Sequence, residues 1–201
     1  SAMIVYNSKL SQWVFMLALP LFFLRYALHI YFYIRSSQKR IIQEEVEHVL
    51  REYHINTTPL IGFVWSIHRN PYFLSLFYYR IGQSRAYLCS FFKKEYSEFN
   101  ICCDKLGTIK FYHPFSTILN AKSIGDNFVC RNNTTIGNTN NDYSLRPVIG
   151  NNVELGANVI VFGNITIGDN VKIGAGAVVN KNVPSDCVVV GNPFRIIQKM
   201  K

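Results

Sequence analysis

Hydrophobic residues in the second half of the chain recur at every sixth position. One run comprises Leu106, Tyr112, Ile118, Ile124, Cys130 and Ile136, and a second comprises Ile149, Leu155, Val161, Ile167, Ile173 and Val179. This period fits neither an α-helix, with about 3.6 residues per turn, nor an open sheet, whose side chains alternate. It predicts short strands joined at the corners of a three-sided parallel β-helix, with the repeat residues pointing inward.

The turns between these positions support the same fold. Glycine often follows the repeat residue, and Asp126-Asn127, Asn151-Asn152 and Asp169-Asn170 occupy the intervening turns. Glycine and asparagine tolerate the left-handed backbone conformation that tight corners require. Because three hexads form one coil, the repeats predict about four coils. The polar segment 138–147 interrupts them, and we expect it to protrude as a loop, a common carrier of function on a rigid scaffold.

The first half of the chain is predicted to be helical, beginning with a strongly apolar and aromatic stretch over residues 10–34. Pro20, Arg25 and His29 interrupt the stretch, and basic residues follow it. An aromatic-rich apolar helix with a basic flank suits contact with a membrane surface through residues 10–40. Packing against other helices or another subunit, and a true membrane span, are the alternatives.

Two further helical regions follow. Residues 38–54 predict a polar helix whose glutamates Glu44, Glu45, Glu47 and Glu52 are exposed. Residues 63–81 predict an aromatic-rich helical region that breaks at Asn70-Pro71. The chain is therefore expected to be α+β, with a helical domain over residues 3–100. Residues 101–201 would form a left-handed parallel β-helix with a protruding loop and a C-terminal tail.

Composition changes this picture little. The formal net charge is +9 over 201 residues, but the basic residues are spread along both halves rather than gathered in a stripe. This distribution argues against a nucleic-acid partner. The five cysteines are odd in number and fit neither a zinc site nor a small disulfide scaffold. We therefore expect reduced thiols in a cytoplasmic protein.

The C-terminal sequence resembles a known family. The residues from Ile149 to Ile197 are similar to the hexapeptide-repeat acyltransferases, in the serine acetyltransferase-like branch that includes many bacterial polysaccharide O-acetyltransferases. The resemblance covers about residues 98–201. Its most specific part is the ending, residues 180–184 (Asn-Lys-Asn-Val-Pro) followed by residues 190–195 (Val-Gly-Asn-Pro-Phe-Arg). The first half resembles only the helical extensions that some members carry.

This resemblance implies a homotrimer with active sites between neighbouring prisms. It also implies direct attack of an acceptor hydroxyl on acetyl-CoA, with a histidine as general base and with neither a metal nor an acyl-enzyme. His113 falls where the family places that histidine, and it is the only histidine in the predicted β-helix. A histidine, whose ordinary pKa is near neutral, suits removal of a hydroxyl proton. The alternative is a purely structural corner residue.

Two departures from the family concern the acceptor. The aspartate that orients the catalytic histidine in serine acetyltransferases has no clear counterpart, since the nearest acidic residues are Glu98 and Asp104. Those enzymes also carry a second histidine in the protruding loop, where this chain has Arg146. The loss of that histidine favours a sugar hydroxyl over serine as the acceptor.

Further site residues follow from the resemblance alone. Coenzyme A would contact Gly156, Ala157, Gly174 and Ala175, whose small size allows close approach. Lys181 and Arg195 would meet its phosphates, unless they are ordinary surface charges. Asn138, Tyr143 and Arg146 would lie at the acceptor end.

The leading hypothesis is an acetyl-CoA-dependent O-acetyltransferase acting on a sugar or a polysaccharide precursor, with a lipid-linked sugar at the inner face of a bacterial membrane as one form of that acceptor. Serine O-acetylation is the first alternative, and a non-catalytic β-helix scaffold is the second. A β-helical zinc carbonic anhydrase would need three histidines to hold the metal, and the predicted β-helix has one.

Overall fold

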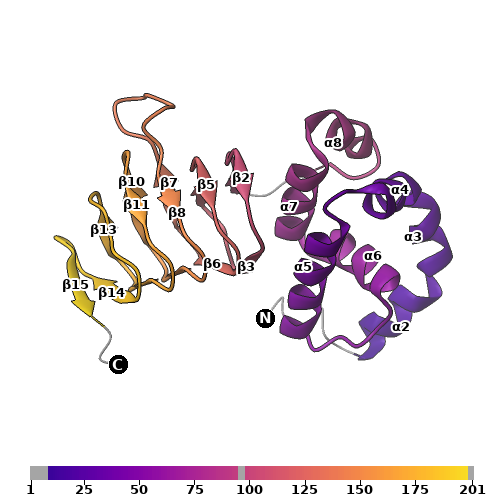
Figure 1. The fold of residues 1–201 in the computed structure, drawn as a ribbon. Coiled ribbons are helices and arrows are strands. Elements are labelled where there is room, and N and C mark those ends of the chain that lie inside the picture. Colours follow the sequence, from indigo (N-terminus) through magenta and orange to yellow (C-terminus); the bar gives the residue numbers. More distant parts are fainter. Residues whose placement is uncertain (1–8, 95–97, 199–201) are drawn as a thin grey trace. The chain divides into compact units, whose positions relative to one another are not determined.

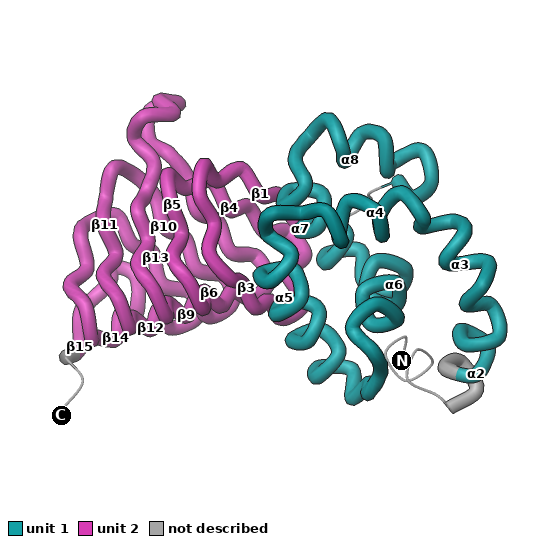
Figure 2. The backbone as a smooth tube through the Cα atoms, turned by 45° about the vertical axis from the view of Figure 1, so that its right-hand side comes forward, with its two compact units in different colours: residues 1–96 teal, residues 97–201 magenta. Residues whose placement is uncertain are grey.

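The structure, a computed structural model, describes residues 9–94 and 98–198 (Figure 1). The chain divides into two compact units, residues 1–96 and residues 97–201 (Figure 2). The first unit is helical and the second is built from strands. The first strand of the second unit begins at Phe99, slightly before the predicted boundary at residue 101.

The first unit contains seven helices within its described residues: α2 (Lys9–Leu17), α3 (Leu19–Arg25), α4 (Ala27–Arg35), α5 (Lys39–Glu52), α6 (Pro59–Arg69), α7 (Pro71–Ile81) and α8 (Gln83–Ser90). The apolar stretch thus forms three short helices, α2 to α4. No helix among the described residues has both the length and the apolar character needed to cross a bilayer. The predicted break at Asn70-Pro71 is confirmed, because the Asn70 side chain accepts hydrogen bonds from the backbone nitrogens of Tyr72 and Phe73 and caps α7.

The predicted exposure of the glutamates on α5 is wrong for Glu45. Glu44 and Glu47 are exposed, but Glu45 is only 2% exposed. It lies on the same helix face as the buried Ile42 and Val49, three and four residues away. A buried carboxylate needs a partner, and Arg80 of α7 supplies it through two hydrogen bonds. The ion pair therefore joins α5 to α7 inside the helical core.

Two histidines, the buried His29 and the half-buried His68, join the N-terminal helices to α6 and α7. His29 Nε2 lies 3.0 Å from the Tyr78 hydroxyl, and the Tyr26 hydroxyl lies 2.9 Å from His68 Nδ1. Burial, followed by the nearby charges of Arg25 and Lys93, lowers the pKa of His29 to about 4. The pKa of His68 is also lowered to about 4, again chiefly by burial. Both imidazoles are therefore neutral near pH 7.

The second unit is a parallel β-helix of three sheets, as predicted. The first sheet contains β1 (Phe99–Ile101), β4 (Thr117–Leu119), β7 (Thr135–Gly137), β10 (Ile160–Phe162) and β13 (Val178–Val179). The second sheet contains β2 (Lys105–Leu106), β5 (Ser123–Ile124), β8 (Val148–Ile149) and β11 (Thr166–Ile167). The third sheet contains β3 (Ile109–Tyr112), β6 (Phe128–Arg131), β9 (Glu154–Leu155), β12 (Lys172–Ile173) and β14 (Cys187–Val190), with β15 (Arg195–Gln198) added antiparallel at its end.

The β-helix has about five coils rather than the predicted four. We number the coils from the N-terminus, so that β1 to β3 form coil 1 and β13 and β14 belong to coil 5. The repeat pattern missed β1, whose buried Phe99 precedes the first counted position, and β14, which follows the last. In the regular part the coils are eighteen residues apart, as in the pairing of Lys105 with Ser123 and of Val148 with Thr166.

All six repeat residues of the second run are buried, but two positions of the first run are wrong. Phe111 and Leu119 point inward, whereas Tyr112 is half-buried and Ile118 is 43% exposed. The pairing explains the shift, because Ile109 pairs with Phe128 nineteen residues on and Ile118 pairs with Thr135 seventeen residues on. A shift of one residue in a strand exchanges its two faces.

His29 and His68 predict a pH-dependent stability of the helical unit. Because both histidines have a folded-state pKa near 4, the unfolded chain binds more protons than the folded one between about pH 4 and pH 6.5. Stability is therefore complete above pH 6.5 and declines as the pH falls toward 4. Both tryptophans lie in this unit, so tryptophan fluorescence should report a thermal midpoint several degrees lower at pH 5 than at pH 7.5.

A variant that carries His29→Gln and His68→Gln should lose most of this dependence. The exposed His54 provides the matched control, and His54→Gln should keep it. If the thermal unfolding midpoint of the wild type does not change between pH 7.5 and pH 5, the lowered pKa values of His29 and His68 would be contradicted.

Candidate active site

Two corners of the β-helix carry the predicted site residues. The corner that leads from the third sheet into the first is here called the base edge, because His113 lies on it between β3 and β4. The corner that leads from the first sheet into the second is called the loop edge. There the segment 138–147 between β7 and β8 protrudes as predicted (Figure 1).

His113 is exposed at the base edge at the end of coil 1. Its backbone has a φ of 49°, in the left-handed region, and its carbonyl accepts a hydrogen bond of 2.8 Å from the nitrogen of Phe115. This tight turn directs the chain outward. Among the described residues the imidazole makes no hydrogen bond, so both ring nitrogens are open to a substrate. Glu98 supports the turn instead, by accepting a hydrogen bond of 3.1 Å from Ser116 Oγ.

The small residues predicted to contact coenzyme A follow His113 along the base edge. Gly156 and Ala157 lie after β9 in coil 3, and Gly174 and Ala175 lie after β12 in coil 4. With about 4.8 Å between coils, they lie roughly 10 to 14 Å along the axis from His113. A Cβ at Gly156 would lie 2.6 Å from the backbone nitrogen of Ala175, so stacking of the coils requires glycine there.

A hollow of about 320 Å³ lies beside β13 in coil 5 and is lined by Val178, Asn180, Lys181, Asn192, Pro193 and Phe194. Arg195 is exposed, follows Phe194 and pairs with Val190 at the end of β14, beyond the base edge of coil 4. Lys181 is also exposed, but it follows β13 and precedes Val183, which bridges to β11 of the second sheet, so it lies at the loop edge. The structure thus aligns the four small residues with His113, places Arg195 near the end of this column, and places Lys181 on the other edge.

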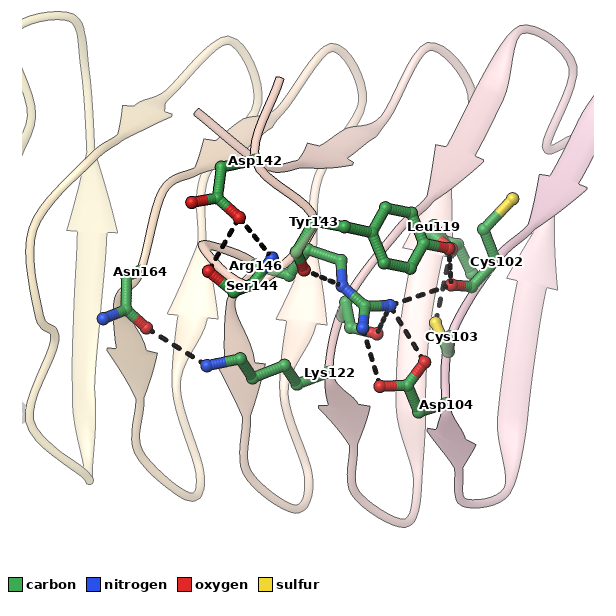
Figure 3. A network of polar contacts seen from close by, with 11 residues as sticks. Cys102, Cys103, Asp104, Leu119, Lys122, Asp142, Tyr143, Ser144, Arg146 and Asn164 are labelled. Atoms are coloured by element: carbon green, nitrogen blue, oxygen red, sulfur yellow. Dashed lines mark hydrogen bonds and ion pairs between the residues drawn. The ribbon is translucent and has the colours of Figure 1, made fainter. Parts of the chain in front are cut away.

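Arg146 anchors the protruding loop (Figure 3). Its side chain is only 5% exposed, and its Nη1 and Nη2 donate to the two carboxylate oxygens of Asp104 at 3.0 and 2.7 Å. Nη1 also donates to the carbonyls of Cys102 and Ala121, and Nε donates to the carbonyl of Tyr143. The hydrogen bond from Arg146 lowers the pKa of Asp104 below its ordinary value. Arg146 is therefore turned into the base of the loop.

Tyr143 covers this guanidinium on the outside. Its ring centre lies 3.8 Å from Arg146 Cζ, and its side chain remains 56% exposed. Asn138 directly follows β7, where the loop begins. The three predicted acceptor residues therefore all lie at the loop edge, where Tyr143 and Arg146 contact each other. They are separated from His113, because the two edges border opposite sides of the first sheet.

The Asp104–Arg146 pair is the site feature that sequence reasoning missed. Asp104 entered the sequence analysis only as a candidate for orienting His113, but the structure pairs it with Arg146, 42 residues away. Asp104 and Arg146 are charged residues in polar segments, and no sequence pattern links one to the other. Only the stacking of coil 3 above coils 1 and 2 brings them together.

The remaining predicted chemistry concerns thiols and metals. All five cysteines are free, and only Cys102 is exposed. Burial raises the pKa of Cys103 to about 11, which keeps this thiol protonated at neutral pH. In the described part of the chain, no group of three or more His, Cys, Asp or Glu side chains is placed to hold a metal ion.

Part of the β-helix matches a known protein family. The family described as bacterial transferase hexapeptide (six repeats) matches residues 146–181, from the end of the loop to coil 5. The β-helix carries the hexapeptide repeats of this family, and its fold fits a hexapeptide-repeat acyltransferase. The matched residues form the regular half of this hexapeptide-repeat β-helix, where the eighteen-residue register is kept.

Relatives of this chain are named as acetyltransferases. One of them is WcaB of Escherichia coli K12, which is named as a colanic acid biosynthesis acetyltransferase. It is 46% identical over 86 residues, which are 42% of this chain and 53% of WcaB. A serine acetyltransferase of Synechococcus elongatus is 48% identical over 77 residues, 38% of this chain and 32% of that protein. The chain thus spans about half the length of WcaB and a third of the Synechococcus protein.

A solved structure is similar over more of the chain. The serine acetyltransferase of Neisseria gonorrhoeae matches with a TM-score of 0.58 and 27% identity, over 84% of this chain and 69% of that one. The similarity therefore extends beyond the β-helix into the helical unit.

Proposed function

We propose that this chain is an acetyl-CoA-dependent O-acetyltransferase that modifies a hydroxyl of a sugar or a polysaccharide precursor. The observation that carries the proposal is the column of residues on the base edge. An exposed histidine, which makes no hydrogen bond among the described residues, stands in coil 1, small residues follow in coils 3 and 4, and Arg195 lies beyond them, where β15 pairs with the end of β14. The 46% identity to WcaB over 86 residues supports the reaction class.

In the proposed reaction, His113 acts as the general base. The imidazole takes the proton of the acceptor hydroxyl while the hydroxyl oxygen attacks the thioester carbonyl. The carbon–sulfur bond then breaks, and the thiol of coenzyme A leaves with a proton returned by His113. The small residues of coils 3 and 4 leave room for the pantetheine arm, and Arg195 offers positive charge to the phosphates.

The loop edge favours a sugar over serine as the acceptor. A serine acceptor presents a carboxylate, which calls for an accessible cation. The guanidinium of Arg146 is buried and neutralised by Asp104, while the most exposed group beside it is the ring of Tyr143. Serine O-acetylation is the second candidate, since the serine acetyltransferase structure matches most of the chain.

We further propose that the active enzyme is a homotrimer. Within one copy, the first sheet separates His113 at the base edge from the acceptor loop at the loop edge. A cyclic arrangement of three prisms places unlike surfaces of neighbouring copies against each other. The base edge of one copy can then face the loop edge of the next, which would complete one site at each of three interfaces.

Substitution of His113 tests the proposed base. Because the residue has a positive φ, His113→Asn keeps a side chain that tolerates this backbone conformation while it removes the imidazole. We expect the release of thiol from acetyl-CoA in the presence of saccharide acceptors to fall about 10²- to 10⁴-fold, with little change in the KM for acetyl-CoA.

The matched control is His54→Asn, which changes another exposed histidine with a positive φ and should retain wild-type turnover. Undiminished turnover by His113→Asn would contradict the role of His113. Turnover of wild type with L-serine but with no saccharide would select the second candidate function.

We also propose that the N-terminal helices bind the anionic inner face of a bacterial membrane, where a lipid-linked sugar would be met. Helices α2 and α3 expose the large apolar side chains of Trp13, Leu17, Leu21 and Leu24. The first 43 residues contain five lysines and arginines and no aspartate or glutamate. An exposed apolar face with only positive charge around it matches the interface of an anionic bilayer.

Sedimentation with vesicles tests this surface. We expect the protein to bind vesicles containing phosphatidylglycerol, to bind phosphatidylcholine vesicles much less, and to lose binding as salt rises. Leu17→Ser with Leu24→Ser should abolish binding. A control, Ile197→Ser, changes an exposed apolar residue of the β-helix unit and should leave binding intact. Equal binding by both variants, or a change in oligomeric state without vesicle binding, would contradict the proposal.

A further inference from the structure

We propose that Tyr143 is a stacking platform for the ring of the acceptor sugar, held in position by Arg146 and Asp104. The inference deepens the proposed function, because it names the part of the loop that recognises the acceptor and the kind of surface it recognises. Three observations carry it: the level of Tyr143 along the β-helix, the side of its ring that is occupied, and the charge balance beneath it.

The loop folds back along its edge toward coil 1. It leaves the β-helix after β7, in coil 3, yet Arg146 binds Asp104 and the Cys102 carbonyl of coil 1 and the Ala121 carbonyl of coil 2. The Tyr143 hydroxyl also lies 3.5 Å from the Cys102 carbonyl. Figure 3 shows Tyr143 beside Cys102, with Arg146 reaching inward. Tyr143 therefore lies at the level of coil 1.

His113 ends coil 1, so Tyr143 and His113 share one level on two different edges. In a cyclic trimer whose axis runs parallel to the β-helix, rotation leaves this level unchanged. The loop edge of a neighbouring copy then presents Tyr143 at the height of His113. The contacts of Arg146 to coils 1 and 2, together with the contact of the Tyr143 hydroxyl with the Cys102 carbonyl, hold Tyr143 at this level.

The ring of Tyr143 has one face covered and the other available. The Arg146 guanidinium lies against it at 3.8 Å, while more than half of the tyrosine side chain is exposed. The C–H groups of a pyranose form an apolar face that packs against an aromatic ring, while the sugar hydroxyls remain free for reaction. Serine has no such face. An exposed aromatic ring here therefore selects a sugar.

The charges beneath the ring are paired, so the platform offers no net charge to the acceptor. The carboxylate of Asp104 accepts hydrogen bonds from both Nη atoms of Arg146. This paired arrangement suits a planar guanidinium, and a lysine ammonium group cannot reproduce it. Nε of Arg146 donates a hydrogen bond of 2.7 Å to the carbonyl of Tyr143. This bond fixes the backbone of the tyrosine whose ring the guanidinium supports. Arg146 is thus a positioning residue, and Tyr143 is the residue that would touch the sugar.

The test compares Tyr143→Ala with Tyr143→Phe in steady-state kinetics on pyranoside acceptors. Tyr143→Ala should raise the KM for the saccharide about tenfold, with the KM for acetyl-CoA unchanged. Tyr143→Phe keeps the ring and should raise the saccharide KM clearly less than Tyr143→Ala does. Arg146→Lys should also raise the saccharide KM, and it should increase hydrogen exchange of residues 138–147.

Two results would overturn the proposal: an unchanged saccharide KM in Tyr143→Ala, or a loss in Tyr143→Phe as large as in Tyr143→Ala. Ligand-detected NMR with methyl pyranosides measures binding without turnover, and so separates this proposal from the proposed function. If wild type acetylates no sugar, weaker pyranoside binding by Tyr143→Ala would still support the platform. Equal binding by Tyr143→Ala and wild type would reject it.

Discussion

The stacking of coils is the constraint on which the second unit depends. Each strand of the β-helix bonds to the strand one coil later, and in the regular part this spacing is eighteen residues. Because the coils are stacked in this way, the equivalent corners of successive coils lie in one column. Residues far apart in sequence therefore share one edge. His113, the Gly156-Ala157 pair and the Gly174-Ala175 pair are aligned in this way. The same constraint keeps His113 and the acceptor loop apart, because they belong to different columns.

Regular repetition made much of the fold predictable from sequence. The six positions from Ile149 to Val179 are all buried as expected, since no insertion disturbs their spacing. Near the turn at His113 the spacing changes to nineteen and then seventeen residues, and there the pattern placed Tyr112 and Ile118 on the wrong face. The corner that carries the proposed base thus disrupts the period from which the fold was predicted.

Charged pairs were the part that sequence could not supply. Glu45 looked like an exposed residue of a polar helix until Arg80, 35 residues later, proved to be its buried partner. Arg146 was placed at the acceptor end because it occupies the loop position where serine acetyltransferases carry a second histidine, whereas its contacts with Asp104 lie across two coils. The burial of Glu45 and the pairing of Arg146 escaped prediction because a local pattern reports the helix face or the loop, but not the distant charge that allows a side chain to be buried.

These features combine into one account of the proposed site. The base edge would supply His113 and a row of small residues for the acyl donor, acetyl-CoA. The loop edge would supply the ring of Tyr143 as an aromatic surface for the acceptor at the level of His113. In the proposed mechanism neither edge is sufficient within one copy. The separation of the two edges is the reason that we propose an assembly of copies as part of the mechanism.

Complementation between inactive copies tests this account most directly. One chain would carry His113→Asn with an intact loop, and the other would keep His113 but have residues 139–145 replaced by glycines. If a site joins the base edge of one copy to the loop edge of the next, each mixed trimer should regain activity at one of its three sites, which is about a quarter of all sites in a random equal mixture of the two chains. Mixed trimers as inactive as the two parents would show that the site does not lie between copies.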